Sequence, residues 1–167
     1  MKRLWGIFAA ALVLATVFWA WRWKQDEPRR YSLASLERLD AALHSNSPSA
    51  LLDTLVMPAA LQGRTAAEQT EFLRKALNDE ISPEGLAVLK KEGRFGALTN
   101  LFPAEGAAWA AQAGVKPEDC VAFRLDRTKG FRAEVVLARF QAPGSPLPAT
   151  YRIVRCNNVR AANSEHR

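Results

Sequence analysis

The first long hydrophobic run of the chain predicts a helix that crosses a membrane. Residues 4–21 carry no charged side chain, and basic residues stand on both sides of the run. At 1.5 Å per residue this stretch makes a helix about 27 Å long, close to the hydrocarbon thickness of a bilayer. Indole rings favour the boundary between lipid and water. The expected anchor residues at the two ends are Trp5, Trp19, Trp21 and Trp23.

A cleaved signal peptide and a buried core helix are the alternatives for this segment. A core helix would show a polar face, whereas this run is apolar on all sides. At its end, Phe18-Trp19-Ala20 puts a bulky residue at the outer position of a cleavage site. Val13-Leu14-Ala15 fits such a site better, but cutting there would leave an apolar stretch exposed. We therefore expect an uncleaved anchor over residues 1–24, followed by a charged linker over residues 25–30.

The charges around the run give two answers about its orientation. A count of Lys and Arg mildly favours a cytoplasmic domain. A short basic segment before an apolar run is, however, how an export signal usually begins. We expect a single-pass membrane protein of bacterial type whose soluble domain is periplasmic or otherwise extracytoplasmic.

From residue 31 to residue 119 the spacing of apolar residues is helical. Leucines recur every three or four residues from Leu33 to Leu43, after Ser32 as a candidate N-cap. Asn46-Ser47-Pro48 ends that helix and starts a second one, which Pro58 limits. These patterns predict a helical first half for the soluble domain.

Three further helices are expected before residue 115. Thr65 and Glu68 form a capping box, in front of a stripe of apolar residues expected to be buried. Ser82-Pro83 opens another helix, which ends near Gly93. An alanine-rich helix over residues 103–113 surrounds Trp109 and ends at Gly114. The stripe behind the capping box consists of Phe72, Leu73, Ala76 and Leu77.

After residue 119 the apolar period changes to two, which is typical of strands. Strands are expected over residues 121–125, 131–140 and 149–156, with turns at 126–130 and 142–148. A short additional strand is possible within residues 94–98. The sequence thus predicts an α+β fold, in which several short helices pack on one face of a three- to four-stranded antiparallel sheet. The domain is expected to span residues 31–160, with a disordered tail at 161–167.

This order of elements resembles nuclear-transport-factor-2-like (NTF2-like) and cystatin-like domains at the level of fold. Helices come first and a curved antiparallel sheet follows, as in those folds. The departure is the strand count, because such domains generally use four or more strands. The resemblance implies no function, since these folds host both enzymes and passive binding modules.

The two cysteines, Cys120 and Cys156, are expected to stay unbridged. In a meander the first and third strands run parallel, so a cysteine that starts one and a cysteine that ends the other lie about 20 Å apart. A disulfide needs Cα atoms within about 7 Å, which would require another strand order or a bulged chain end. The alternative to a bridge is a pair of small buried thiols.

The formal net charge of +6 is unevenly distributed. Residues 31–119 hold 8 basic and 12 acidic residues, whereas residues 120–167 hold 9 basic and 3 acidic ones. This arginine-rich end would suit an acidic protein surface, anionic lipid headgroups or the acidic half of a second copy. Nucleic acid is not expected, because Phe123, Phe131 and Tyr151 fall on the apolar face of the sheet, away from the arginines.

The candidate ligand site is the polar face of the predicted sheet. Glu134 is the one acidic residue expected in the middle of a strand, and arginines flank it. Arginine forks could bind a carboxylate or phosphate there, with the acid orienting them. The alternative is a cross-strand ion pair on a solvated face. The predicted ligand-binding residues are Arg124, Arg132, Glu134 and Arg152.

No catalytic, cofactor or metal motif is recognisable in the sequence. The chain has two histidines and two cysteines, and neither a CxxC pair nor a glycine-rich phosphate loop occurs. His44 is placed to cap a helix end. We therefore expect no catalytic residues, no metal and no cofactor, and an enzyme is the less favoured class.

Two functions remain open from the sequence. The first is a membrane-anchored protein whose small domain binds a protein partner or a second copy, as a scaffold or accessory subunit of a cell-envelope assembly. The second is a domain that binds a small anionic ligand on the Arg/Glu-lined sheet face, conceivably as a weak enzyme.

Overall fold

The computed structural model describes residues 2–45, 48–58, 61–78, 80–126, 132–141, 149–157 and 159. The side chains of residues 2–10, 48 and 132 lie outside this description. So do the predicted break at Asn46-Ser47, most of the turn at 126–130, the turn at 142–148 and the tail at 161–167. The chain divides into two compact units, Met1–Arg30 and Tyr31–Arg167, which are described separately.

In the first unit, α1 (Lys2–Gln25) is one continuous helix. A turn at Asp26 follows, and α2 (Glu27–His44) begins at the next residue. Of the residues predicted as a linker, Gln25 ends α1, Asp26 forms the turn, and residues 27–30 begin α2. Pro28 is tolerated there because the first turn of a helix has no backbone acceptor for its nitrogen. Among the residues that the structure describes, no helix is both long and apolar enough to cross a membrane.

The helices of the second unit begin and end largely where the sequence patterns indicate. After α2 come α3 (Pro48–Thr54), α4 (Ala66–Asn78) and α5 (Pro83–Glu92). The capping box is confirmed, because the Thr65 backbone N–H donates to Glu68 Oε2 at 2.9 Å and the Glu68 N–H donates to Thr65 Oγ1 at 3.4 Å. Ser82 caps α5 by accepting from the Gly85 N–H at 3.1 Å.

Two details of this helical part were predicted wrongly. Ser32 is not an N-cap, because α2 starts five residues earlier and the side chain is buried inside it. Phe72 and Ala76 are exposed on α4, with 57% of Phe72 accessible. The helix turns about 100° per residue, so Leu73 and Leu77 face the core and Phe72 is carried away from it.

The sheet contains four antiparallel strands in the order β1-β2-β3-β4. The three predicted strands are confirmed, and the possible short strand exists as β1. Their bounds are β1 (Arg94–Ala97), β2 (Cys120–Asp126), β3 (Arg132–Phe140) and β4 (Thr150–Asn157).

The sequence patterns predicted that all helices come before the sheet, but some of them lie between two of its strands. Between β1 and β2 the chain forms α6 (Leu98–Leu101), α7 (Gly106–Gln112) and a short 3₁₀ helix, η2 (Pro117–Asp119). Gly106 lets α7 approach α6 closely, because a Cβ at that position would lie 3.0 Å from Leu98 Cγ. At the other end of α7, Gly114 has φ +68°, which glycine adopts without strain. The predicted helix end at Gly114 is confirmed.

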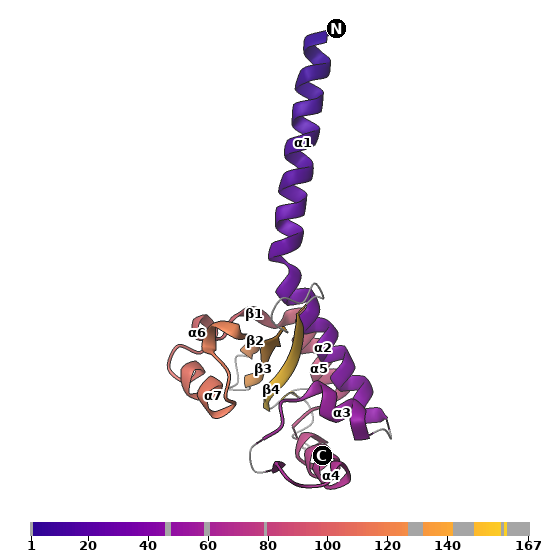
Figure 1. Cartoon of the computed structure of the whole chain (residues 1–167), viewed down its shortest axis with the longest axis vertical. Coiled ribbons are helices and arrows are strands. Elements are labelled where there is room, and N and C mark those ends of the chain that lie inside the picture. The colour runs from indigo at the N-terminus through magenta and orange to yellow at the C-terminus, as the bar shows by residue number, and fades with distance from the viewer. Residues whose placement is uncertain are drawn as a thin grey trace. The chain divides into compact units, whose positions relative to one another are not determined.

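Helices cover both faces of the sheet (Figure 1). On one side, which we call the broad face, Phe123, Val135 and Ile153 join a core built with α2, α3, α4 and α5. On the other side, which we call the cleft face, Ala122, Val136 and Ala138 pack with residues of α6 and α7. The hydroxyl of Ser35 on α2 donates to the Tyr151 carbonyl of β4 at 2.7 Å. The prediction that helices cover only one face is therefore wrong.

Candidate functional site

Two of the four predicted ligand-binding residues are direct neighbours across the sheet. Arg124 on β2 pairs in register with Glu134 on β3. The Arg124 Nε donates to Asp126 Oδ1 at 2.7 Å, and its Nη1 donates to the Leu101 carbonyl at 2.9 Å. Arg124 thus closes the last turn of α6 against the sheet. Its hydrogen bonds are directed to the protein itself.

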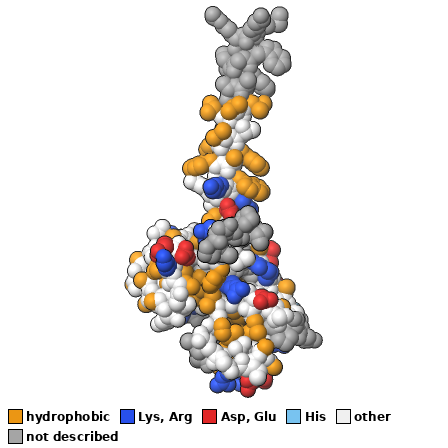
Figure 2. Space-filling view, viewed as in Figure 1, with side chains coloured by type: hydrophobic (Ala, Val, Ile, Leu, Met, Phe, Trp, Pro, Cys, Tyr) orange, Lys and Arg blue, Asp and Glu red, His pale blue; other side chains and the backbone are white. Residues whose placement is uncertain are grey.

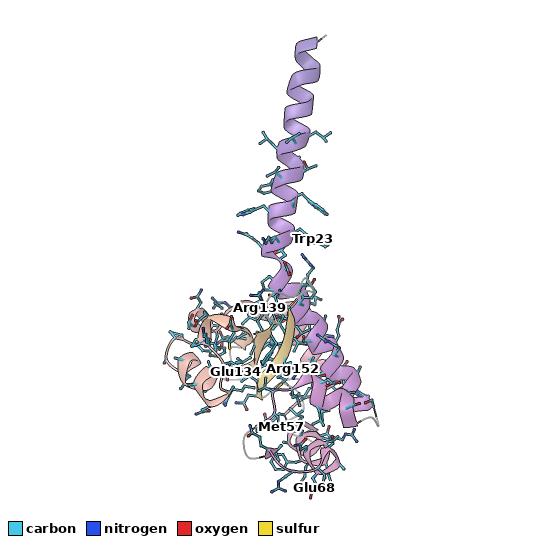
Figure 3. All side chains as sticks on the ribbon, viewed as in Figure 1. Trp23, Met57, Glu68, Glu134, Arg139 and Arg152 are labelled. Atoms are coloured by element: carbon cyan, nitrogen blue, oxygen red, sulfur yellow. The ribbon has the colours of Figure 1, made fainter. Side chains whose placement is uncertain are left out.

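Of the other two residues, Arg152 lies away from this pair. Arg152 lies opposite Ala138, four positions along β3 from Glu134, and its Cζ is 5.5 Å from the ring centroid of Phe140. Glu134 is buried, with 5% exposed, whereas Arg152 is exposed. Figure 3 labels both residues at the sheet. Arg132 pairs with Asp126 along the backbone, and its side chain is outside the description. The described members of the predicted set therefore do not converge on one pocket.

A β-bulge in β4 changes which side chains share the cleft face. Val136 pairs with Arg155 and Leu137 pairs with Ile153, so Val154 is an extra residue on β4. A bulge re-aims the side chains on its strand. Beyond it, Arg155 shares the register of Val136 on the cleft face, and Val154 packs against the same cluster. If Val154 were instead paired with Val136 in an unbulged strand, Arg155 would face the broad core.

Next to the bulge, the cleft face is hollowed by a pocket of about 460 Å³. Its walls come from the chain after α3, from the end of α7 and from β4. Most of the lining is apolar or amide in character. The residues around the pocket are Val56, Met57, Pro58, Gln62, Trp109, Ala111, Gln112, Ala113, Gly114, Val154 and Arg155.

We call this whole pocket the cleft. Arg155 and Trp109 form its most polar part. The Arg155 Cζ lies 4.5 Å from the ring centroid of Trp109, a cation–π contact. The tryptophan ring also contacts that of Phe102, with centroids 5.0 Å apart and planes tilted by 54°. The Arg155 Nε is buried and has no hydrogen-bond partner. A guanidinium held in this way keeps its charge and its unused donors.

The two cysteines are free, as expected, but for a reason that the sequence did not show. Cys120 pairs with Ala138 and packs on the cleft face, whereas Cys156 pairs with Val135 and packs toward the broad face. Burial raises the pKa of Cys120 to about 11, and the nearby Asp119 and Glu118 add to the rise. Burial, with Glu80 as a second cause, raises the pKa of Cys156 to about 12. Both thiols are protonated near neutral pH.

Groups of three or more His, Cys, Asp or Glu residues that could hold a metal ion are absent from the described part of the chain. His44 ends α2, and its Nδ1 lies 2.8 Å from the Asp40 carbonyl oxygen, which fits the predicted position at a helix end. Among the described residues that line the cleft, Arg155 is the only ionisable one. The arrangement is suited to binding.

Sequence reasoning missed the cleft although parts of it were visible. Trp109 is the one tryptophan outside the predicted anchor, and Val135-Val136-Leu137-Ala138 is an unbroken apolar run. Such a run is typical of a strand that is covered on both faces. The bulge, in contrast, left no recognisable pattern. Comparison of the chain with protein-family models, with curated proteins and with solved structures finds no match.

Proposed function

We propose that the chain is a single-pass membrane-anchored protein whose domain at residues 31–160 docks a protein partner. It would act as an accessory or scaffold subunit of a cell-envelope assembly. The observation that carries the docking part is the open, largely apolar cleft beside the bulge of β4. Concave sites with a few convergent polar groups are where binding is concentrated in proteins.

The anchor part of the proposal is supported by α1 and its sequence. The uncharged run at residues 4–21 lies within this one helix. Its described side chains include exposed leucine, valine, phenylalanine and tryptophan, visible in Figure 2 as hydrophobic groups along the helix. Exposed apolar area of this kind is costly in water and favourable in lipid.

The end of α1 supports a membrane boundary at that point. Trp19 and Trp23 stack with their centroids 5.3 Å apart, and the Arg30 Cζ lies 3.8 Å from the centroid of Trp23. Aromatic rings beside a cation are typical of the lipid–water interface. For orientation, we propose that the soluble domain is exported.

The anchor is tested by placing a charge in the middle of α1. In the full chain, Leu12→Arg or Leu14→Arg adds about 2.5–3.5 kcal/mol to the cost of insertion. Each variant should therefore shift the protein from the alkali-washed membrane fraction toward the soluble fraction. Phe72→Arg is the matched control, since it makes the same kind of change on an exposed position of α4. Equal fractionation of all four proteins would overturn the anchor.

Orientation and partnership need separate measurements. A reporter enzyme that is active only outside the cytoplasm, fused after the domain, should be active in cells, and activity of a cytoplasmic reporter instead would reverse the orientation. Crosslinking in intact membranes should recover one partner in stoichiometric amount. Repeated recovery of the lone monomer would overturn the docking function.

A further inference from the structure

The cleft contains a positive charge that the described protein does not neutralise. Arg155 makes no hydrogen bond or ion pair with a described residue. Its polar interaction with the described residues is the cation–π contact with the ring of Trp109. A half-buried guanidinium that makes no ion pair is costly to hold, because burial removes part of its hydration. An anion bound in the cleft would relieve that cost.

A carboxylate fits this charge better than a phosphate does. The fork of a guanidinium matches the two oxygens of a carboxylate, and stacking on Trp109 leaves the edge of the fork free. A phosphate carries about two charges, whereas the lining supplies a single cation. The remaining lining, which includes Met57 and Val154, is suited to an apolar group beside the carboxylate.

The edge of β4 favours a peptide over a free small acid. β4 is the last strand in the sheet order. Its outer edge is bridged to Leu55 at Ile153, and the next bridge is between Ile81 and Val159. Between these two points no described segment pairs with the strand. Val154 and Arg155 lie within this stretch and also line the cleft, so an extended chain could hydrogen-bond to the edge while its side chains enter the cleft.

We propose that the cleft binds an extended segment of a partner protein that carries an Asp or Glu next to a bulky apolar residue. The carboxylate of that segment pairs with Arg155, the apolar side chain packs on Trp109, Met57 and Val154, and the main chain lies along β4. Trp109 positions the guanidinium. This inference rests on the proposed docking function and specifies the chemistry of the partner.

The first test uses the full chain in detergent micelles and an array of octapeptides. Each octapeptide contains one Asp or Glu flanked by Leu, Val, Phe or Trp, and a twin has Asn or Gln in its place. The wild type should bind a subset of the acidic octapeptides at least tenfold more tightly than their amide twins. Binding without preference for the acid would overturn the proposal.

Variants then locate the binding. Arg155→Gln should lower the affinity for the selected octapeptides at least tenfold. Arg155→Lys should lower the affinity less, because it keeps the charge. Trp109→Leu should also lower the affinity for these octapeptides, whereas Trp109→Phe, which keeps a ring, should lower it less. Arg139→Gln is the matched control, since it removes the same charge from an exposed position on β3. Thermal unfolding of each variant without peptide separates lost binding from lost folding.

Two further outcomes are decisive. If acetate or benzoate binds as tightly as the selected octapeptides, the cleft is a small-acid site and the peptide proposal fails. If Arg155→Gln still recovers the crosslinked partner from membranes at the wild-type level, the docking function stands and the cleft is not its site. If neither variant nor wild type recovers a partner, the proposed function itself fails.

Discussion

The two faces of the sheet are built from the same strands but differ in how completely they are covered. On the broad face, α2, α3, α4 and α5 enclose Phe123, Val135 and Ile153, which are at most 1% exposed. On the cleft face, two short helices cover Ala122, Val136 and Ala138 and leave a pocket of about 460 Å³ beside them. Small residues and short helices make a layer that fills less space, so a binding site can lie next to it.

Under the proposed docking function, the broad face would serve stability and the cleft face would serve binding. Phe123 of the broad face has its ring 5.0 Å from that of Phe95, inside the core. Trp109 of the cleft face has a similar aromatic contact but remains half exposed, with an arginine over its ring. The bulge at Val154 supplies the arginine to the cleft face. We therefore expect a new charge to be costly in the core of the broad face and tolerated on the cleft face.

Val135→Asp should have the largest effect. Val135 is fully buried in the core of the broad face, so the new carboxylate has no access to water. Because an uncompensated buried charge alone costs about 3–5 kcal/mol and apolar packing is lost as well, we expect the free energy of unfolding to fall by more than about 5 kcal/mol. Urea unfolding of the full chain in micelles measures it. Val154→Asp places the same charge on the half-exposed lining of the cleft and should cost only about 1–2 kcal/mol. Similar values for the two variants would contradict the difference between the two faces.

Phe123→Ala should be the next largest change. The ring is fully buried in the broad core, and truncation of such a ring costs about 3–5 kcal/mol. Loss of hydrogen-exchange protection should extend over the sheet and α5. Phe102→Ala, on the cleft face, should instead concentrate that loss in α6 and α7. If both variants gave the same pattern of exchange, the two faces would form one cooperative unit and the comparison would fail.

Arg124→Met should cost about 1–2 kcal/mol. It removes the donor to the Leu101 carbonyl while keeping most of the side-chain volume, so a part-buried acceptor loses its partner. The control is Arg94→Met, because Arg94 pairs with Arg124 across the strands and is exposed. That control should change the free energy of unfolding by less than about 0.5 kcal/mol. A cost for Arg94→Met equal to that for Arg124→Met would assign the effect to net charge.

The smallest expected effect is a dependence on alkaline pH. Thiols of the unfolded chain ionise near pH 8.5–9, whereas burial raises the pKa of Cys120 to about 11 and that of Cys156 to about 12. Above about pH 9 the unfolded state therefore binds fewer protons than the folded state, so the free energy of unfolding falls as pH rises toward 11.

The pH effect can be assigned to each face by single substitutions. Cys120→Ala removes the contribution of the cleft face, and Cys156→Ala removes that of the broad face. Each variant should show a shallower decrease in the free energy of unfolding between pH 9 and pH 11 than the wild type does. An unchanged slope in the variant Cys120→Ala would mean that the cleft face admits water to the thiol.

The sequence predicted the elements better than it predicted their packing. Caps and breaks such as Thr65 with Glu68, Ser82 and Gly114 act over a few neighbouring residues, so they could be recognised one at a time. The α+β class and the strands could be predicted because the spacing of apolar residues changes after residue 119 from a helical period to alternation. The exposure of Phe72 could not be recognised, because a stripe of four apolar residues does not show which of them meets the core.

The candidate site depended on contacts between distant parts of the chain. Arg155 and Trp109 are 46 positions apart, and the contact between them requires both α7 on the cleft face and an extra residue in β4. Alternation alone placed Arg152 with Val154 and gave Arg155 the opposite face. Register also decides which arginine meets Glu134: Arg124 lies directly opposite it, whereas Arg152 lies opposite Ala138.

The hydrogen bond from Ser35 to the Tyr151 carbonyl has a mechanical consequence. Tension applied along the chain at residue 30 enters the domain through α2, whose residues 31–44 belong to the second unit. The bond passes part of that load directly to β4, four residues from Arg155. A pull on the N-terminal segment is thus passed in part to the strand that forms the cleft.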